Sequence, residues 1–181
     1  MNSDIAILAV PGVQMLDVCG PLDVFAEANR ILQRQVYTPV VMSFSTPVLR
    51  SSSGVRLTAD RLLSESADYS PQTFLVAGAP GITDIIAEPQ QLDAISGLCR
   101  RSQRFGSVCS GALLLAQTGL LQGKRVTTHW ACASELASRF PQMASKTLAG
   151  ECGFASVDVM RRAFVRVTGM TPGVYGRLFT R

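Results

Sequence analysis

The sequence predicts an α/β fold in which a parallel sheet is covered by helices on both faces, followed by a short all-helical tail. Strand-like and helix-like segments alternate through most of the 181 residues, which is the pattern of βαβ units. The strand-like segments are continuous apolar runs, as expected of strands buried on both faces. Residues 146–181 hold six Lys and Arg against two Asp and Glu, whereas residues 1–145 hold 11 of each. Such a basic tail is typical of a module that meets a polyanion, although a solvated tail has the same composition.

Each element is placed by its local pattern. Short apolar runs predict the strands, in order, at residues 5–10, 37–44, 73–77, 105–108 and 125–128, with a hairpin at 48–50 and 55–58. Helical spacing of apolar residues predicts the helices at residues 16–32, 89–101, 111–121 and 129–140. Gly123 is expected to end the third of these helices.

Ligands of parallel sheets bind outside the carboxyl ends of the strands, so Cys109, His129 and the turn at residues 78–81 are expected to share one pocket.

Cys109 stands where an apolar strand turns into a Leu- and Ala-rich helix. Its small neighbours Ser107, Ser110 and Gly111 allow other backbone to approach closely, as in a strand-turn-helix elbow. The N–H groups and the dipole at the start of a helix favour a thiolate over a thiol. Cys109 is therefore the candidate reactive residue. The alternative is a buried cysteine that packs as a small hydrophobe.

The rest of the composition predicts a reduced, cytoplasmic globular protein. Hydrophobic residues make up 47% of the chain, enough to bury the core of one domain. The amino terminus lacks a basic region, and the first apolar run is too short for a signal peptide or a membrane span, so no membrane contact is expected. The five cysteines form no CxxC pair, so neither a metal site nor a cofactor is expected, and the cysteines other than Cys109 are expected to pack.

Three motifs occur in order along the first 142 residues. They are residues 16–25 (LDVCGPLDVF), residues 107–112 (SVCSGA) and residues 119–130 (GLLQGKRVTTHW). Together they resemble the ThiJ/PfpI superfamily, which has the class I glutamine amidotransferase-like, flavodoxin-like fold, and in particular the branch that forms the amino-terminal domain of AraC-type regulators. The resemblance implies a nucleophile-elbow cysteine at Cys109, an acidic residue beside it at Asp17, and a neighbouring histidine at His129.

The chemistry of these residues allows more than one role for each. An ionised Asp17 beside Cys109 would raise the pKa of the thiol, whereas a protonated Asp17 would donate a hydrogen bond to the thiolate and lower it. Asp17 could instead be a helix N-cap. His129 is the only histidine, so it is either the imidazole available for proton transfer near pH 7 or a structural cap of the following helix. The backbone N–H groups of Gly78 and Ser110 are expected to form an anion or oxyanion site.

The last 36 residues carry a second set of motifs. They are residues 147–156 (TLAGECGFAS), 160–164 (MRRAF) and 168–172 (TGMTP), which resemble the second helix-turn-helix unit of the AraC/XylS family. A turn at residues 152–154 followed by a helix over 156–167 is the geometry that places a recognition helix in the major groove. The expected DNA contacts are Ser156, Val157, Asp158, Arg161, Arg162 and Arg166. The alternative is an amphipathic basic helix with a solvated face.

These resemblances imply a sensor domain over residues 1–143 and a DNA-binding unit over residues 144–181. Relatives in both families have further strands and helices after the Thr-Thr-His-Trp motif and an additional helix-turn-helix unit, so the sensor domain is expected to be shortened near residues 143–146. One implied function is a homodimeric transcriptional regulator that binds duplex DNA and a small-molecule effector. The other is an isocyanide hydratase-like hydro-lyase with Cys109 as nucleophile and Asp17 as acid/base. The basic tail favours the regulator.

Overall fold

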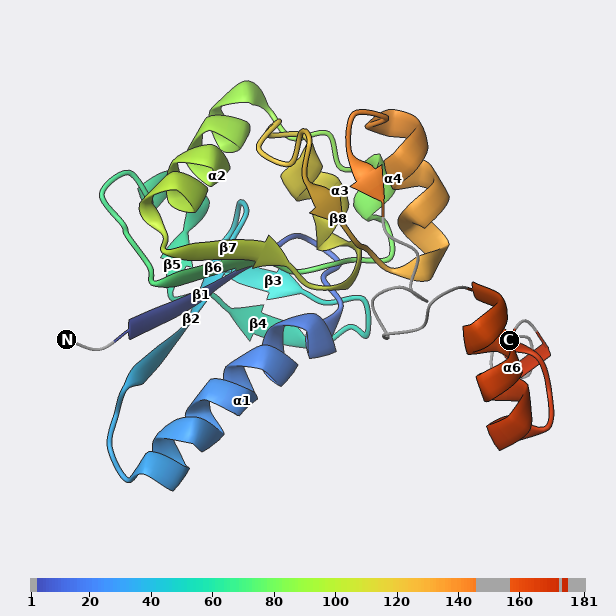
Figure 1. Cartoon of the computed structure of the whole chain (residues 1–181). Coiled ribbons are helices and arrows are strands. Elements are labelled where there is room, and N and C mark those ends of the chain that lie inside the picture. The colour runs from blue at the N-terminus through green and yellow to red at the C-terminus, as the bar shows by residue number, and fades with distance from the viewer. Residues whose placement is uncertain (1–2, 146–156, 173, 176–181) are drawn as a thin grey trace.

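A five-stranded parallel sheet forms the centre of the molecule in the computed structural model, which describes residues 3–145, 157–172, 174 and 175 (Figure 1). Its strands lie in the order β5-β2-β1-β6-β7, and every neighbouring pair is parallel. Their bounds are β1 Ser3–Ala9, β2 Tyr37–Ser43, β5 Arg61–Leu62, β6 Thr73–Val76 and β7 Arg104–Ser107. The parallel α/β architecture predicted from the alternation is therefore confirmed.

Helices cover both faces of this sheet. The helices are α1 Met15–Leu32, α2 Pro89–Arg101, α3 Ala112–Ala116, α4 Ala133–Arg139 and α6 Val157–Thr168, with single turns η1 Leu63–Glu65, η2 Ile82–Asp84, η3 Cys109–Gly111 and η4 Trp130–Cys132. Figure 1 shows α1 on one side of the sheet and α2 and α3 on the other. Along β1, Leu8 packs in the same core as Phe74, and Ile7 packs in a second core with Val18 of α1. Burial of both faces explains why the strands read as continuous apolar runs.

The antiparallel hairpin of β3 (Val48–Arg50) and β4 (Arg56–Thr58) lies where the sequence predicts it. The strand predicted at residues 125–128 forms only as β8 (Arg125–Val126), and it does not join the central sheet. It pairs in parallel with β9 (Ala144–Ser145) in a separate two-stranded sheet. The expectation that every strand of the alternation enters one sheet is therefore wrong for β8.

The helix after Cys109 is shorter than predicted. It ends at Ala116 rather than Leu121, because the Thr118 hydroxyl donates to the Leu115 carbonyl oxygen at 2.6 Å and competes for the helical acceptors. Gly119 then adopts a φ of 75°, a left-handed conformation that suits glycine. The expectation that Gly123 ends this helix is wrong, because the helix has already ended at Ala116 and the left-handed turn follows at Gly119.

In the tail, α6 runs from Val157 to Thr168, one residue later at each end than the predicted recognition helix. The predicted turn at residues 152–154 and the predicted contact Ser156 lie outside the described residues. The two-domain boundary at residue 143 stays a prediction. No helix among residues 3–145, 157–172, 174 and 175 is long and apolar enough to span a membrane.

Candidate active site at Cys109

Cys109 lies on a sharp turn between β7 and α3, with a φ of 54°. This left-handed conformation is costly for a residue with a Cβ, and such strain is concentrated at functional sites. The residue before the turn, Val108, is anchored to β6, because its N–H donates to the Val76 carbonyl oxygen at 2.9 Å. Any Cβ at position 111 would overlap that same Val76 oxygen. Gly111 is therefore required for the turn, and the thiol of Cys109 is exposed rather than packed in the core.

Asp17 lies in the first turn of α1, with 8% of its surface exposed. The N-cap of α1 is Gln14, so the alternative role of Asp17 as an N-cap is wrong. One carboxylate oxygen of Asp17 accepts a hydrogen bond from the Gly78 N–H at 3.1 Å. The carboxylate also hydrogen-bonds with the Cys109 thiol. The acidic residue implied by the family resemblance is therefore in contact with the candidate nucleophile.

The pKa values of these two groups are coupled. Burial raises the pKa of the Asp17 carboxyl, against the opposing effects of the Gly78 N–H, the Cys109 thiol and the His129 charge. Partial burial of its sulfur in the pocket also raises the pKa of the Cys109 thiol, and the negative charge of Asp17 raises it further, while the N–H and the hydroxyl of Ser110 act in the opposite direction. The expectation that the helix N-terminus shifts Cys109 toward the thiolate is therefore wrong, because burial and Asp17 outweigh it.

His129 connects to Cys109 through the backbone. Its N–H donates to the Cys109 carbonyl oxygen at 3.3 Å, and the Thr128 hydroxyl donates to the same oxygen at 3.1 Å. The imidazole is at the start of η4, where its Nδ1 accepts from the Ala131 N–H at 3.4 Å. The capping role considered for His129 is therefore confirmed, and it leaves Nε2 available for proton transfer. A catalytic role for His129 stays a prediction.

The predicted anion site changes in one respect. The Gly78 N–H is already used by Asp17, so it is not a free donor for a ligand. A Cβ at position 78 would lie 2.6 Å from Ser110 Oγ and 2.7 Å from Asp17 Oδ2, which explains why glycine stands there. The Ser110 hydroxyl bonds to both the N–H and the carbonyl oxygen of Ala79, each at 3.2 Å. Gly78 and Ser110 therefore hold Asp17 and the elbow together, and both the N–H and the hydroxyl of Ser110 hydrogen-bond with the Cys109 sulfur.

Cys109, His129 and the turn at residues 78–81 line one pocket of about 480 Å³, as the carboxyl ends of the strands predict, and Asp17 lines it too. The other residues that line it are Gln14, Leu16, Ala79, Pro80, Ser110, Ala131 and Cys132. Cys132 was expected only to pack, but η4 brings it to this pocket as a second thiol. The signal that could have found it is its position three residues after His129. A larger cavity of about 690 Å³ lies elsewhere, between η1 and α2, and does not include these residues.

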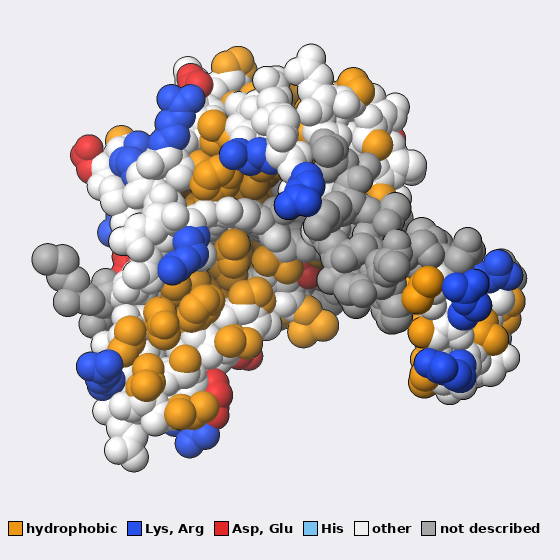
Figure 2. Space-filling view, in the orientation of Figure 1, with side chains coloured by type: hydrophobic (Ala, Val, Ile, Leu, Met, Phe, Trp, Pro, Cys, Tyr) orange, Lys and Arg blue, Asp and Glu red, His pale blue; other side chains and the backbone are white. Residues whose placement is uncertain are grey.

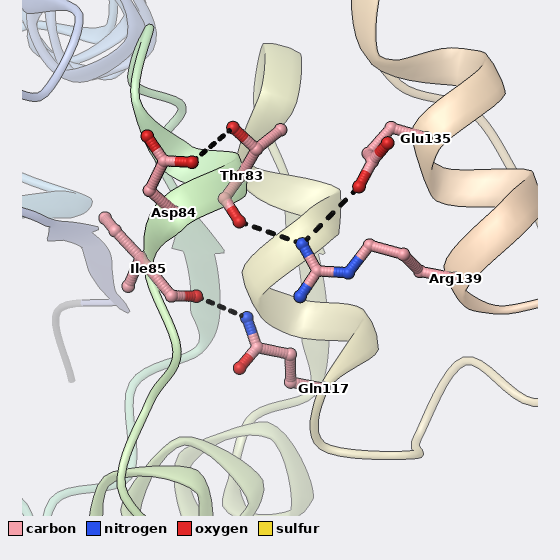
Figure 3. A network of polar contacts seen from close by, with 6 residues as sticks. All are labelled: Thr83, Asp84, Ile85, Gln117, Glu135 and Arg139. Atoms are coloured by element: carbon pink, nitrogen blue, oxygen red, sulfur yellow. Dashed lines mark hydrogen bonds and ion pairs between the residues drawn. The ribbon is translucent and has the colours of Figure 1, made fainter.

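A polar network joins α3 and α4 to η2 and the segment after it (Figure 3). The Gln117 side chain donates to the Ile85 carbonyl oxygen at 2.8 Å and accepts from the Ala87 N–H at 3.1 Å. The Arg139 guanidinium of α4 donates to the Thr83 carbonyl oxygen of η2 at 2.9 Å. Because η2 follows the turn at residues 78–81 and α4 follows His129, this network connects the two segments on either side of the pocket.

Comparison with protein-family models identifies the family. The sequence model of the DJ-1/PfpI family matches residues 3–161. The chain belongs to the DJ-1/PfpI family. A protein of Streptomyces lividans described as an uncharacterized protein in the cpoL 5′ region is 36% identical over 137 residues, which cover 76% of this chain and 94% of the relative. No group of three or more metal-ligating side chains occurs in the part of this DJ-1/PfpI chain that the structure describes.

Two further relatives of this DJ-1/PfpI protein are named for different functions. Isonitrile hydratase of Pseudomonas putida is 35% identical over 131 residues, covering 72% of this chain and 54% of the hydratase. The HTH-type transcriptional regulator GbdR of Pseudomonas aeruginosa is 25% identical over 145 residues, covering 79% of this chain and 38% of the regulator. The chain therefore spans about half the length of the hydratase and less than half the length of the regulator.

Solved structures support the fold. A ThiJ/PfpI family protein from Pseudomonas syringae superposes with a TM-score of 0.68 at 23% identity, covering 81% of this chain and 58% of that one. An AraC family transcriptional regulator from Pseudomonas putida superposes with a TM-score of 0.66 at 19% identity, covering 81% and 77%. Both likenesses establish the flavodoxin-like DJ-1/PfpI architecture.

Proposed function

We propose that this DJ-1/PfpI protein is a cytoplasmic DNA-binding transcriptional regulator, in which the Cys109 pocket binds a small-molecule effector. The observation that carries the proposal is the basic surface of α6. Arg161, Arg162 and Arg166 are exposed and surround a hollow of about 510 Å³. None of these three pairs with a carboxylate among the residues the structure describes. Three unpaired arginines on one short helix suit the phosphates of duplex DNA.

The opposite side of α6 supports this assignment. Phe164 and Tyr175 stack edge to face, with ring centroids 5.3 Å apart. Phe164 is half-buried while Arg162 and Arg166 are exposed, so the helix has an apolar side and a basic side. A recognition helix requires this division, because one side must anchor the helix while the other meets the groove. Val157, Asp158 and Arg161 are positions in the first part of the helix, the part with which recognition helices contact bases.

The Cys109 pocket has the size and lining of an effector site. Its volume of about 480 Å³ falls in the range of small-molecule pockets. Polar groups converge there from α1, the elbow and η4 through Asp17, Cys109 and His129. A small electrophile or a ligand with a hydrogen-bond donor suits this combination of a thiol and a carboxylate.

The test is binding of duplex DNA by the full chain at several salt concentrations, followed by fluorescence anisotropy. Three phosphate contacts predict a slope of log affinity against log salt of about −3. Arg162→Ala with Arg166→Ala should weaken binding and reduce the slope by about 2, since each arginine removes about one phosphate contact. The matched control is Arg34→Ala with Arg56→Ala, which removes the same charge from exposed positions outside α6 and should change little. Equal losses in both variants would contradict a DNA contact specific to α6.

The second candidate function is hydration of an isocyanide. The specific observation in its favour is the hydrogen bond between the Cys109 thiol and the Asp17 carboxylate, together with the 35% identity to isonitrile hydratase. In this chemistry the Cys109 sulfur adds to the isocyanide carbon, the proton held between Cys109 and Asp17 passes to that carbon, and water then displaces the sulfur to give a formamide. Production of a formamide that requires both Cys109 and Asp17, without DNA binding at low salt, would favour the enzyme.

A further inference from the structure

The outer edge of β7 presents unpaired backbone groups. Toward β6, the Arg104 N–H donates to the Gln72 carbonyl oxygen at 3.1 Å and the Val108 N–H donates to the Val76 carbonyl oxygen at 2.9 Å. In a parallel strand, alternate residues direct both their N–H and C=O to the same side. Phe105 and Ser107 therefore direct theirs away from β6. Within the part of the chain that the structure describes, no hydrogen bond uses these four groups.

A groove of about 570 Å³ runs along this edge. The apolar residues that line it are Phe105, Leu115, Leu121 and Val126, and the basic ones are Arg104, Lys124 and Arg125. Phe105 lies beside Phe74 of β6 in the sheet register, so its side chain is on the sheet face covered by α2 and α3. Figure 2 shows hydrophobic side chains flanked by Lys and Arg side chains over this region.

The charged residues along the groove are all basic. The two ion pairs between described residues are Arg30 with Glu27 and Arg139 with Glu135. Arg104, Lys124 and Arg125 thus have no acidic partner in this part of the molecule. No acidic residue lines the groove. An occupant that is complementary in charge must therefore be negatively charged.

We propose that the β7 edge binds an extended acidic peptide segment of a partner protein as an added strand. The N–H and C=O groups of Phe105 and Ser107 supply the main-chain hydrogen bonds of such strand addition. Alternate side chains of an added strand point to opposite faces. Apolar side chains of the peptide enter the hollow lined by Leu115 and Val126, and acidic side chains lie beside Arg104 and Arg125.

The test uses a labelled, capped peptide of alternating Glu and Val and the full chain, followed by fluorescence anisotropy. The Glu–Val peptide should bind, and a peptide with Lys in place of Glu should not. N-methylation of alternate backbone nitrogens should abolish binding, because it removes the donors of the added strand. Arg104→Glu with Arg125→Glu should weaken binding about tenfold or more, while Arg34→Glu with Arg56→Glu should change it much less.

Hydrogen exchange locates the contact. Amides in the segment at residues 104–108 should exchange more slowly when the Glu–Val peptide is bound, and Cys109→Ala should leave the affinity unchanged. Three results would overturn the proposal: no binding of the Glu–Val peptide, equal binding of the Lys peptide, or insensitivity to N-methylation. A concentration-dependent self-association that Arg104→Glu with Arg125→Glu disrupts would also overturn it, since a second copy would then occupy the edge.

Discussion

The Asp17 carboxylate that hydrogen-bonds with the Cys109 thiol also disfavours ionisation of that thiol. Burial and the Asp17 charge both raise the thiol pKa, and the hydrogen bonds from the N–H and the hydroxyl of Ser110 oppose them. Removing the charge while keeping the shape should therefore lower the thiol pKa. We predict that Asp17→Asn speeds the labelling of Cys109 by iodoacetamide at pH 7 and moves the midpoint of its pH–rate profile downward. Asp23→Asn, an exposed change on the same helix, is the control, and a slower rate in Asp17→Asn would contradict the assignment.

The same residue makes a prediction about stability. The pKa of Asp17 is raised in the folded chain, mainly by burial. Its protonated form is therefore the one that folding favours, so its contribution to stability is present at low pH and is lost as pH rises through the folded-state pKa. Asp17→Asn should raise the Tm at pH 7. The difference should disappear below the ordinary carboxyl pKa of 3.8, as measured by circular dichroism melts across pH.

At the scale of elements, the connection between η2 and α3 depends on one amide side chain. Gln117 bonds to two backbone groups of the segment that precedes α2. Gln117→Ala leaves both partly buried groups unpaired and should lower the free energy of unfolding by about 2 kcal/mol. Arg139→Ala should cost less than about 1 kcal/mol, because 31% of that side chain is exposed. Urea denaturation checks both, and equal losses would contradict this ranking.

Elements that depend on a local sequence pattern could be predicted, and elements that depend on contacts between distant residues could not. The helix at residues 89–101 has a proline in its first turn and a clear apolar spacing, and α2 has these bounds. The strands β5 and β9 have only two residues each, so no periodicity could reveal them. The pocket shared by Cys109, His129 and the turn at residues 78–81 followed from strand polarity, whereas Asp17 was placed there by the family resemblance. The use of the Gly78 N–H by Asp17 did not, because it depends on a side chain 61 positions away.

At the scale of the whole molecule, α1 carries apolar side chains that the core does not use. Val24 and Ile31 are seven residues apart on one stripe of the helix, with exposed fractions of 67% and 68%. Figure 2 shows hydrophobic side chains gathered over this part of the surface. Two exposed branched side chains on one helix face suit a symmetric contact with a second copy of the chain. A dimer would also place two recognition helices against the two half-sites of an operator.

We therefore predict a homodimer through α1 at micromolar concentration. Val24→Glu with Ile31→Glu should convert it to a monomer, because each change places a charge where an apolar contact forms. Arg104→Glu with Arg125→Glu changes β7 at the edge of the central sheet and β8 in the separate two-stranded sheet, outside α1, and should leave the dimer intact. Multi-angle light scattering distinguishes these cases. A wild-type chain that is monomeric, or a dimer that survives the two changes on α1, would contradict this interface.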